Sequence, residues 1–307
     1  MGESPDVTQQ GVQQVSVHKQ SENQITASDV VASKGKRRLA VLTAYEYTAA
    51  SIVDSAGVDI VLVGDSLGMV MLGRDDTISV TLDDMISHTR SVVTAVSRAL
   101  VVTDMPFMTY ETGVTDTLRN AARLCAESGV RAVKVEGGRA ILPQVAALVK
   151  SGIPVMGHIG LTPQRSAVLG GFKVQGRTAE AAGDLLRDAL ALQDAGCFSI
   201  VLEAVPALLA EKLSRSLEIP TIGIGAGVGC DGQVLVYHDL LGLFERFVPR
   251  FVKQYAQLAP VIREAVSTYA EEVRSGAFPG PEHSFAMPEA EAAKLDALFA
   301  AIRAGEK

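Results

Sequence analysis

The sequence predicts an α/β fold, a (β/α)8 TIM barrel with extra C-terminal helices. Two observations predict it. Short apolar runs rich in Val, Ile and Leu recur eight times from Leu39 onward, as in strands of a parallel sheet that is covered on both faces. Six of the seven gaps between the runs can hold a helix, and regular alternation of strands and helices is typical of a barrel. The length of 307 residues accommodates one barrel of roughly 250 residues with additional segments.

Each predicted strand is a short run bounded by glycine or polar residues. Stretches with apolar residues at helical spacing lie between several of the runs, at 115–128, 139–151 and 180–195. A glycine follows each of these stretches, at the position where a left-handed residue commonly ends a helix. The eight runs are Leu39–Thr43, Ile60–Val63, Leu100–Thr103, Ala132–Val135, Val155–Ile159, Ser199–Leu202, Thr221–Ile224 and Val234–Tyr237.

The end of the barrel departs from the ideal pattern. The segment Gly225–Gln233 is too short and too rich in glycine for a crossover helix, so either the last unit is irregular or the seventh or eighth strand is misplaced. Two helical stretches, about 250–275 and about 288–303, are expected to pack on the outside of the barrel or on a neighbouring subunit. The long polar segment Gly160–Arg177 is expected to close over a site.

Three segments are expected along the chain. Residues 1–24 are rich in Gln, Ser and Val, a composition that favours a disordered N-terminal tail. Residues 25–285 are expected to form the catalytic barrel, and residues 286–307 a C-terminal helix and tail.

The composition excludes several classes of protein. A formal net charge of -7, without a dense Lys/Arg patch, argues against nucleic-acid binding. Three cysteines without a Cys-x-x-Cys motif suggest neither a disulfide framework nor a zinc site. No uncharged apolar run reaches the roughly 18 residues of a membrane span, and the N-terminus has no apolar signal core. We therefore expect a cytoplasmic protein, or one of the mitochondrial matrix if the source is eukaryotic.

Charged and ionisable residues recur at the carboxyl ends of the predicted strands, where barrel enzymes place their active sites. A single acid at a strand end is more often a helix cap or a surface group. Several acids at one rim repel each other, however, and require a counter-charge. Five successive strands contribute Asp65, Asp104, Lys134, Glu136, His158 and Glu203.

A hard divalent cation would supply this counter-charge. Asp65, Asp104 and Glu136 offer only oxygen ligands, which suits Mg²⁺ better than zinc. Water and substrate oxygens would complete the coordination. The alternative is that these acids pair with Lys134 or an arginine and bind no metal.

The remaining rim residues have two interpretations each. Lys134 and Glu136 are two positions apart and share one side of a strand, so a buried Lys134 would need an anionic partner such as a substrate carboxylate. His158 is either a donor to a substrate oxygen or a core histidine that is satisfied by a carbonyl. Glu203 stands apart from the other acids and is either a general base or the cap of a helix that begins near Pro206.

The segments around these residues resemble the ketopantoate hydroxymethyltransferase family, a member of the phosphoenolpyruvate/pyruvate barrel superfamily. The resemblance covers roughly residues 25–285 and is highly specific as a set. One departure is Glu46, which stands where the family usually has Asp, and we expect only a local adjustment there. The matching segments are Leu42–Tyr45, Leu62–Gly68, Asp104–Phe107, Lys134–Gly138, Gly157–Gln164, Gly170–Arg177, Leu202–Pro206, Ile222–Gly227 and Asp231–Val236.

The resemblance implies a role for each rim residue. Glu203 is implied to be the proton acceptor of the reaction. The residues implied for the Mg²⁺ site, in part through water, are Asp65, Asp104 and Glu136. The residues implied to contact or lie close to the substrate are Asp65, Ser66, Asp104, Lys134 and His158.

The resemblance also implies a reaction. A hydroxymethyl group would pass from 5,10-methylenetetrahydrofolate to 3-methyl-2-oxobutanoate, giving 2-dehydropantoate on the route to pantothenate and coenzyme A. Relatives in the family assemble as homo-oligomers, commonly decamers of two pentameric rings. Nucleic-acid and membrane partners are not expected.

Two rival functions stay open. One is a carbon–carbon lyase or mutase of the same superfamily, such as an isocitrate-lyase-like enzyme, which depends on a cysteine in the active-site loop. No cysteine lies at the carboxyl end of the fourth or fifth predicted strand here, which weighs against this class. The other is a non-catalytic barrel that binds an anionic metabolite and acts through its partners.

Overall fold

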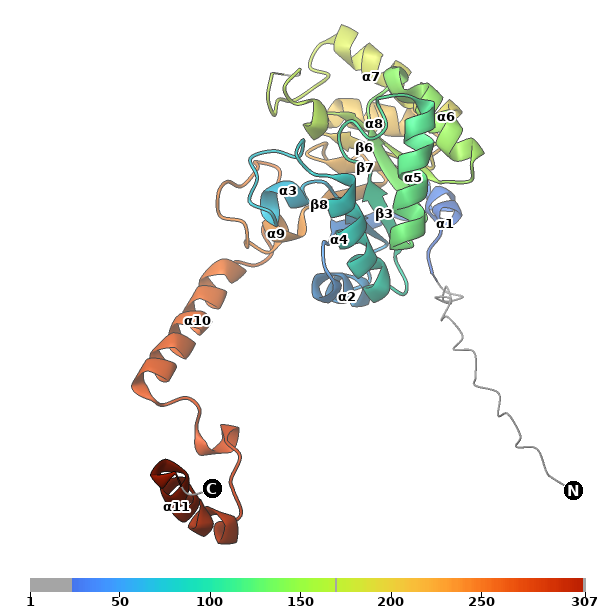
Figure 1. Cartoon of the computed structure of the whole chain (residues 1–307). Helices are drawn as coiled ribbons and strands as arrows, with labels where there is room; N and C mark the ends of the chain where they lie inside the picture. Colours follow the sequence, from blue (N-terminus) through green and yellow to red (C-terminus); the bar gives the residue numbers. More distant parts are fainter. Residues whose placement is uncertain (1–23, 169, 306–307) are drawn as a thin grey trace, which may run out of the picture.

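Eight parallel strands close into a barrel in sequential order, which confirms the predicted (β/α)8 fold (Figure 1). The computed structural model describes residues 24–168 and 170–305, so nearly all of the expected N-terminal tail lies outside the described residues. The first seven predicted strands match within one residue at each end. The strands are β1 (Leu39–Thr43), β2 (Ile60–Val63), β3 (Leu100–Asp104), β4 (Val133–Glu136), β5 (Val155–Gly160), β6 (Ser199–Glu203), β7 (Thr221–Ile224) and β8 (Gly232–Leu235).

Helices occupy the six gaps in which they were predicted. Local chemistry fixes several ends: Thr81 forms a capping box with Asp84, and Gly129 ends a helix in the left-handed conformation. The side chain of Glu46 accepts hydrogen bonds from two backbone N–H groups and caps the first barrel helix. The helices are α1 (Ala27–Ala32), α2 (Tyr47–Ser55), α3 (Leu67–Val70), α4 (Leu82–Ala95), α5 (Val114–Ser128), α6 (Leu142–Lys150), α7 (Ala179–Asp194) and α8 (Ala207–Ser216), with short 3-10 turns at Arg139–Ile141 and Pro163–Arg165.

The core has two layers. One cluster fills the inside of the barrel and includes Val102, Met156 and Val201. A larger cluster lies between the outside of the strands and the helices, and it includes Val101, Leu124 and Leu192. Alternate residues of each strand therefore belong to opposite layers, as the pleat of a strand requires.

The predicted position of the eighth strand was wrong by two residues. Strand β8 begins at Gly232, which pairs with Leu39, and residues after Leu235 turn into the short helix α9 (Tyr237–Leu240). A side chain at Gly232 would lie 2.7 Å from both the Leu39 carbonyl oxygen and the side chain of Ile222, so this close approach requires glycine. No helix connects β7 and β8. The last barrel unit is therefore irregular.

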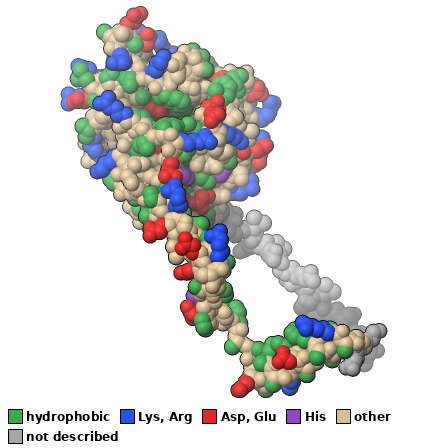
Figure 2. Space-filling view, turned by 90° about the vertical axis from the view of Figure 1, so that its left-hand side faces the viewer, with side chains coloured by type: hydrophobic (Ala, Val, Ile, Leu, Met, Phe, Trp, Pro, Cys, Tyr) green, Lys and Arg blue, Asp and Glu red, His purple; other side chains and the backbone are tan. Residues whose placement is uncertain are grey.

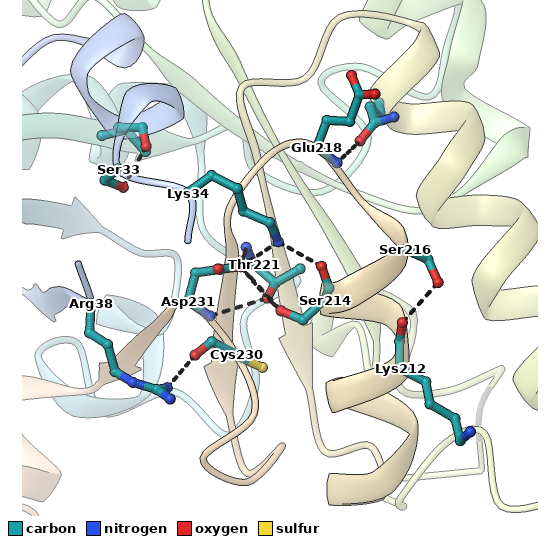
Figure 3. A network of polar contacts seen from close by, with 12 residues as sticks. Ser33, Lys34, Arg38, Lys212, Ser214, Ser216, Glu218, Thr221, Cys230 and Asp231 are labelled. Carbon is teal, nitrogen blue, oxygen red and sulfur yellow. Dashed lines mark hydrogen bonds and ion pairs between the residues drawn. The ribbon is translucent and has the colours of Figure 1, made fainter. Parts of the chain in front are cut away.

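A polar network fastens this irregular unit at the opposite end of the barrel from the site (Figure 3). The Asp231 carboxylate forms an ion pair of 2.7 Å with Lys34 and accepts a hydrogen bond of 2.9 Å from the backbone N–H of Thr221. Lys34 also donates to the backbone carbonyl of Ser214. Two strands, a helix and the segment before β1 are thereby joined where a crossover helix is missing.

The C-terminal helices extend away from the barrel (Figures 1 and 2). Helices α10 (Leu258–Ser275) and α11 (Glu289–Ala304) have no buried residue, so the expected packing on the chain's own barrel is wrong. Helix α10 also begins later than predicted, because the backbone before it bonds to α9, from Tyr255 N–H to the Leu240 carbonyl and from Leu258 N–H to the Leu241 carbonyl. Among the described helices, none combines the length and apolar character that a membrane span needs.

Gly160 offers a test of how closely β5 and β6 approach at the site. Gly160 and Gly152 both have positive φ, +93° and +85°, but only at Gly160 would a Cβ atom meet a neighbour, the Glu203 carbonyl oxygen at 2.3 Å. Gly152→Ala should cost about 1 kcal/mol of backbone strain. Gly160→Ala should cost about 1–3 kcal/mol more, because the strands must move apart. Urea unfolding of the two variants measures the difference, and equal losses would contradict the close approach.

Candidate active site

The barrel register directs the predicted rim residues inward. Val102, Met156 and Val201 belong to the inner core layer. Asp104 and His158 stand two positions after the first two of these and face the same way. In the register of the barrel, Asp104 pairs with Lys134, and Glu136 pairs with His158. Adjacent strands therefore carry their ionisable side chains side by side at one level.

Lys134 is the centre of this cluster. Its ammonium nitrogen lies 3.2 Å from Asp104 Oδ1 and 3.6 Å from Glu136 Oε1, and its side chain is only 5% exposed. Burial disfavours the charged amine, but the carboxylates of Asp104, Glu136 and Asp65 outweigh it and raise the pKa of Lys134. Lys134 is therefore a permanent cation inside the barrel.

His158 lies between two carboxylates. Its Nδ1 atom is 3.2 Å from Glu136 Oε1, and its Nε2 atom is 3.2 Å from Glu203 Oε2. Burial and the Lys134 charge lower the pKa of His158, but Glu136 and Glu203 prevail and raise it to about 9. The imidazolium in turn helps to lower the pKa of Glu136 despite burial. The interpretation as a core histidine that is satisfied by a carbonyl is wrong.

Asp65 and Asp104 are crowded acids. Burial, then repulsion from Asp104 and Glu136, raises the pKa of Asp65 well above its usual range. Burial also raises the pKa of Asp104, although Lys134 opposes it. Asp104 Oδ2 accepts a hydrogen bond of 3.0 Å from the Asp65 N–H. Asp104 Oδ1 and Glu136 Oε1 are buried and accept no hydrogen bond from the described residues, so their only polar contacts are the ion pairs with Lys134 and His158. The cluster thus holds more negative charge than its protein cations neutralise well.

Gln164 and Tyr110 form a buried support that the sequence reasoning did not identify. Gln164 Nε2 donates to Asp65 Oδ2 at 2.8 Å, and its backbone N–H donates to Glu136 Oε2 at 3.0 Å. The Tyr110 hydroxyl donates to Gln164 Oε1 at 2.7 Å and accepts from the Glu136 N–H at 3.0 Å. Gln164 is the last residue of Gly157–Gln164, one of the segments that resemble the family. That resemblance was the signal in the sequence that could have identified Gln164 as a site residue. This support fixes two acids from different strands relative to each other.

Ser66 lies at the start of α3, where its hydroxyl is 2.8 Å from the buried Tyr45 hydroxyl. Burial raises the pKa of that phenol, so it remains neutral. Tyr45 belongs to the loop after β1, and Ser66 to the loop after β2. The hydrogen bond therefore joins neighbouring loops of the rim.

One cavity of about 420 Å³ brings the predicted residues together. Its floor is polar, and its outer wall is largely apolar. The segment Gly160–Arg177 contributes Leu161, Pro163, Phe172 and Val174, so this loop borders the site. Its closure over the site stays a prediction. The predicted residues that line the cavity are Asp65, Ser66, Asp104, Lys134, Glu136, His158 and Glu203.

Neither cysteine chemistry nor a ready-made metal cage is present in the described part of the chain. Cys125 lies on α5, while Cys197 and Cys230 precede β6 and β8 at the far end of the barrel, and none lines the cavity. Within residues 24–168 and 170–305, no group of three or more His, Cys, Asp and Glu side chains has the geometry of a direct metal cage. A cation at this floor would keep water or substrate oxygens among its ligands.

The charge of His158 can be measured directly. In the metal-free protein its ring should be protonated at neutral pH and lose the proton near pH 9. Because the pKa of the folded state is raised, the stabilisation is complete below pH 6.5 and falls by about 3 kcal/mol as the pH rises to 9. NMR titration of the ring carbons, assigned with His158→Asn, gives the midpoint. A midpoint at or below 6.5 would contradict the ion pairs.

Comparison with known proteins identifies close relatives of the whole barrel. The family model described as "Ketopantoate hydroxymethyltransferase" matches residues 24–281. The chain is 64% identical over 278 residues to the 3-methyl-2-oxobutanoate hydroxymethyltransferase of Nitratidesulfovibrio vulgaris, covering 91% of this chain and 90% of that protein. It is 63% identical to the protein of the same name from Oleidesulfovibrio alaskensis, covering 87% and 92% of the two chains.

Solved structures with the same fold are far more distant in sequence. Phosphonopyruvate hydrolase in complex with oxalate and Mg²⁺ aligns with a TM-score of 0.55 at 12% identity, covering 91% of this chain and 98% of that chain. A 2,3-dimethylmalate lyase of the PEP mutase/isocitrate lyase superfamily aligns with a TM-score of 0.53 at 14% identity, covering 91% and 93%. At this identity the comparison supports the barrel fold alone.

Proposed function

The chain belongs to the ketopantoate hydroxymethyltransferase family and is a hydroxymethyltransferase, and we propose that its polar cavity floor enolises 3-methyl-2-oxobutanoate with the help of Mg²⁺. The one-carbon donor would be 5,10-methylenetetrahydrofolate, and the product would be 2-dehydropantoate. The observation that carries the proposal is the buried cluster of three acids and one lysine, which stands beside the separate carboxylate of Glu203.

The floor of the cavity fits a divalent cation. Two buried carboxylate oxygens, Asp104 Oδ1 and Glu136 Oε1, accept no hydrogen bond from the described residues and have only ion-pair contacts with Lys134 and His158. Asp65 and Asp104 have raised pKa values, as expected for acids that lack enough positive charge nearby. All three side chains offer oxygen atoms, the ligands that Mg²⁺ prefers. Bound there with water, Mg²⁺ would draw electron density from the keto group and make the neighbouring C–H acidic.

The chain's own residues perform the remaining tasks. Lys134 supplies a fixed positive charge for the substrate carboxylate, and Ser66 lines the same cavity. Glu203 lines the cavity but has no contact with the proposed Mg²⁺ ligands apart from the shared His158. This separation leaves its carboxylate free to take the proton from C3 of the keto acid. The ion pair between His158 Nε2 and Glu203 Oε2 orients the Glu203 carboxylate.

The apolar outer wall favours transfer over hydrolysis. Phe172 and Val174 from the long loop, with Phe247 and Phe251 from the segment after α9, border the space above the floor. Apolar walls keep water away from a reactive one-carbon unit. A thiol-dependent lyase mechanism finds no support, since no cysteine of the described chain reaches the cavity.

Assembly and location extend the proposal. We propose a homo-oligomer, such as a decamer of two pentameric rings, because α10 and α11 expose large apolar side chains that a neighbouring subunit would cover. These side chains include Val261, Val266 and Tyr269 on α10 and Phe299 on α11. The proposed location is the cytoplasm, or the mitochondrial matrix in a eukaryote.

Replacement of Glu203 by Gln tests the base. The variant should bind the keto acid with Mg²⁺ as the parent does, but hydrogen–deuterium exchange at C3 should fall by at least about 100-fold, in line with the loss of a general base. NMR of 3-methyl-2-oxobutanoate in D₂O gives the rate, and omission of Mg²⁺ should abolish exchange in the parent. Exchange at the parental rate in the variant would remove Glu203 from this role. Binding without any exchange in the parent would favour the non-catalytic alternative.

Replacement of Asp104 by Asn tests the cation site without substrate turnover. Mn²⁺ serves as a paramagnetic probe for Mg²⁺, and its affinity should fall by at least about 10-fold, because a buried anionic ligand is lost. Electron paramagnetic resonance measures the concentration of free Mn²⁺, from which the affinity of each variant follows. Asp116→Asn is the matched control, since Asp116 pairs with Arg119 on the exposed surface of α5. Equal Mn²⁺ affinity in both variants would contradict a cation at this floor.

A further inference from the structure

The cavity is larger than the keto acid requires. A volume of about 420 Å³ lies in the range that commonly surrounds a drug-sized ligand, whereas the keto acid has only eight non-hydrogen atoms. The charged floor occupies the ends of β2 to β6. The outer part is bordered by Met69, Phe172, Val174, Phe247 and Phe251. The side chains of Phe172 and Phe247 are 58% and 50% exposed. Their apolar surfaces are therefore accessible to a ligand or a partner.

The segment after α9 lines this outer part of the cavity with Phe247 and Phe251. A side chain at Gly225 would lie 2.8 Å from the Phe251 ring, so the glycine at the end of β7 allows the ring to seat against the backbone. Gly225 can contact the segment after α9 because β7 is followed directly by β8, with no helix between them. The absence of a crossover helix between β7 and β8 thus leaves room for the outer part of the cavity.

Asp239 is a buried carboxylate in this cavity without a role in the keto-acid chemistry. It stands on α9 and is 8% exposed. Its carboxyl group forms no hydrogen bond or ion pair within the described residues. Burial alone raises its pKa to about 6, so it is ionised above that pH. A carboxylate that lines a cavity and has no protein partner can accept hydrogen bonds from a ligand that carries N–H donors.

Thr77 is a second buried polar group on the cavity wall. It lies in the loop before α4, is 3% exposed, and its hydroxyl has no hydrogen-bond partner in the described structure. Asp239 on α9 and Thr77 in the loop before α4 are far apart in the sequence, yet both line the same cavity. Two polar groups without a protein partner, in a cavity with aromatic walls, fit a flat ring that has apolar faces and polar groups at its edge.

We propose that this outer chamber, lined by Thr77, Phe172, Asp239, Phe247 and Phe251, binds the pterin ring of the one-carbon donor, with Asp239 accepting the N–H groups of its aminopyrimidinone edge. The inference rests on the proposed folate-dependent function. The 2-amino group and N3–H of a pterin point the same way, as two N–H groups of a guanidinium do. A carboxylate accepts such a pair through both oxygens.

The surrounding residues agree with this assignment. An unpaired carboxylate repels anionic ligands and selects N–H donors, while phenyl rings stack on either face of a flat heterocycle. The Thr77 hydroxyl can donate to, or accept from, the polar edge of the ring. Arg250 is exposed on the same wall and forms no ion pair within the described chain, so its guanidinium is available to the glutamate carboxylates of a folate.

Calorimetry with tetrahydrofolate tests Asp239. In the presence of Mg²⁺ and keto acid, Asp239→Asn should bind tetrahydrofolate about 10- to 100-fold more weakly, since a charge-assisted pair of hydrogen bonds is lost. Its unfolding temperature should not fall, because a costly buried charge is removed. Glu245→Gln is the matched control: it loses the same charge from an exposed residue that pairs with Arg263 outside the cavity.

A smaller probe separates the two ends of the donor. Asp239→Asn should weaken binding of 6-methyltetrahydropterin as much as that of tetrahydrofolate, because both carry the same ring edge. Arg250→Ala should weaken only tetrahydrofolate, by about 2- to 5-fold, as expected for one exposed ion pair. Arg246→Ala is its control, since Arg246 faces Asp75 outside the cavity. Equal effects of Arg250→Ala on both probes would overturn its assignment to the glutamate end.

The exchange reaction distinguishes failure of the inference from failure of the proposed function. Asp239→Asn should retain hydrogen–deuterium exchange at C3 of the keto acid within about 2-fold, while the KM for 5,10-methylenetetrahydrofolate rises by at least 10-fold. If the parent protein exchanges C3 but neither binds tetrahydrofolate nor transfers its one-carbon unit, the folate-dependent function itself fails. If the parent does both and Asp239→Asn binds tetrahydrofolate as tightly, only the assignment of Asp239 is overturned.

Discussion

The arrangement of this site depends on a buried lysine surrounded by carboxylates. Lys134 is almost inaccessible to water, and a charge in that position persists only because Asp104 and Glu136 lie within 4 Å. The same acids repel each other and Asp65, so the lysine alone does not balance them. The result is a cavity floor that is ordered by the protein and still attracts further positive charge. Removal of one partner would leave another buried charge without compensation.

Order in this cluster comes from two sources. The barrel register places Asp104 beside Lys134 and Glu136 beside His158, so adjacent strands align their charges without any flexible loop. Gln164 then joins the two acids at either side, Asp65 and Glu136, through donors on its side chain and its backbone. Fixed ligands of this kind reduce the reorganisation that a bound cation and substrate would otherwise require.

The irregular end of the barrel has a consequence for the shape of the cavity. Where β7 passes directly to β8, the chain has no helix to cover the rim, and residues 243–257 turn back over it instead. That segment contributes the phenyl rings of Phe247 and Phe251 to the cavity, and α9 contributes Asp239. A departure from ideal topology therefore leaves the cavity open to apolar side chains from the segment after α9.

The sequence by itself determined the strands, most helices and the charged floor. Apolar runs of four or five residues predict barrel strands because both of their faces must be buried. Residues at the carboxyl ends of such strands converge in any closed barrel. Asp65, Asp104, Glu136 and Glu203 could be found in this way. The tertiary structure alone decided the start of β8, the support by Gln164 and the place of Asp239. These depend on how distant segments meet when the barrel closes, and that contact leaves no periodic signal in the chain.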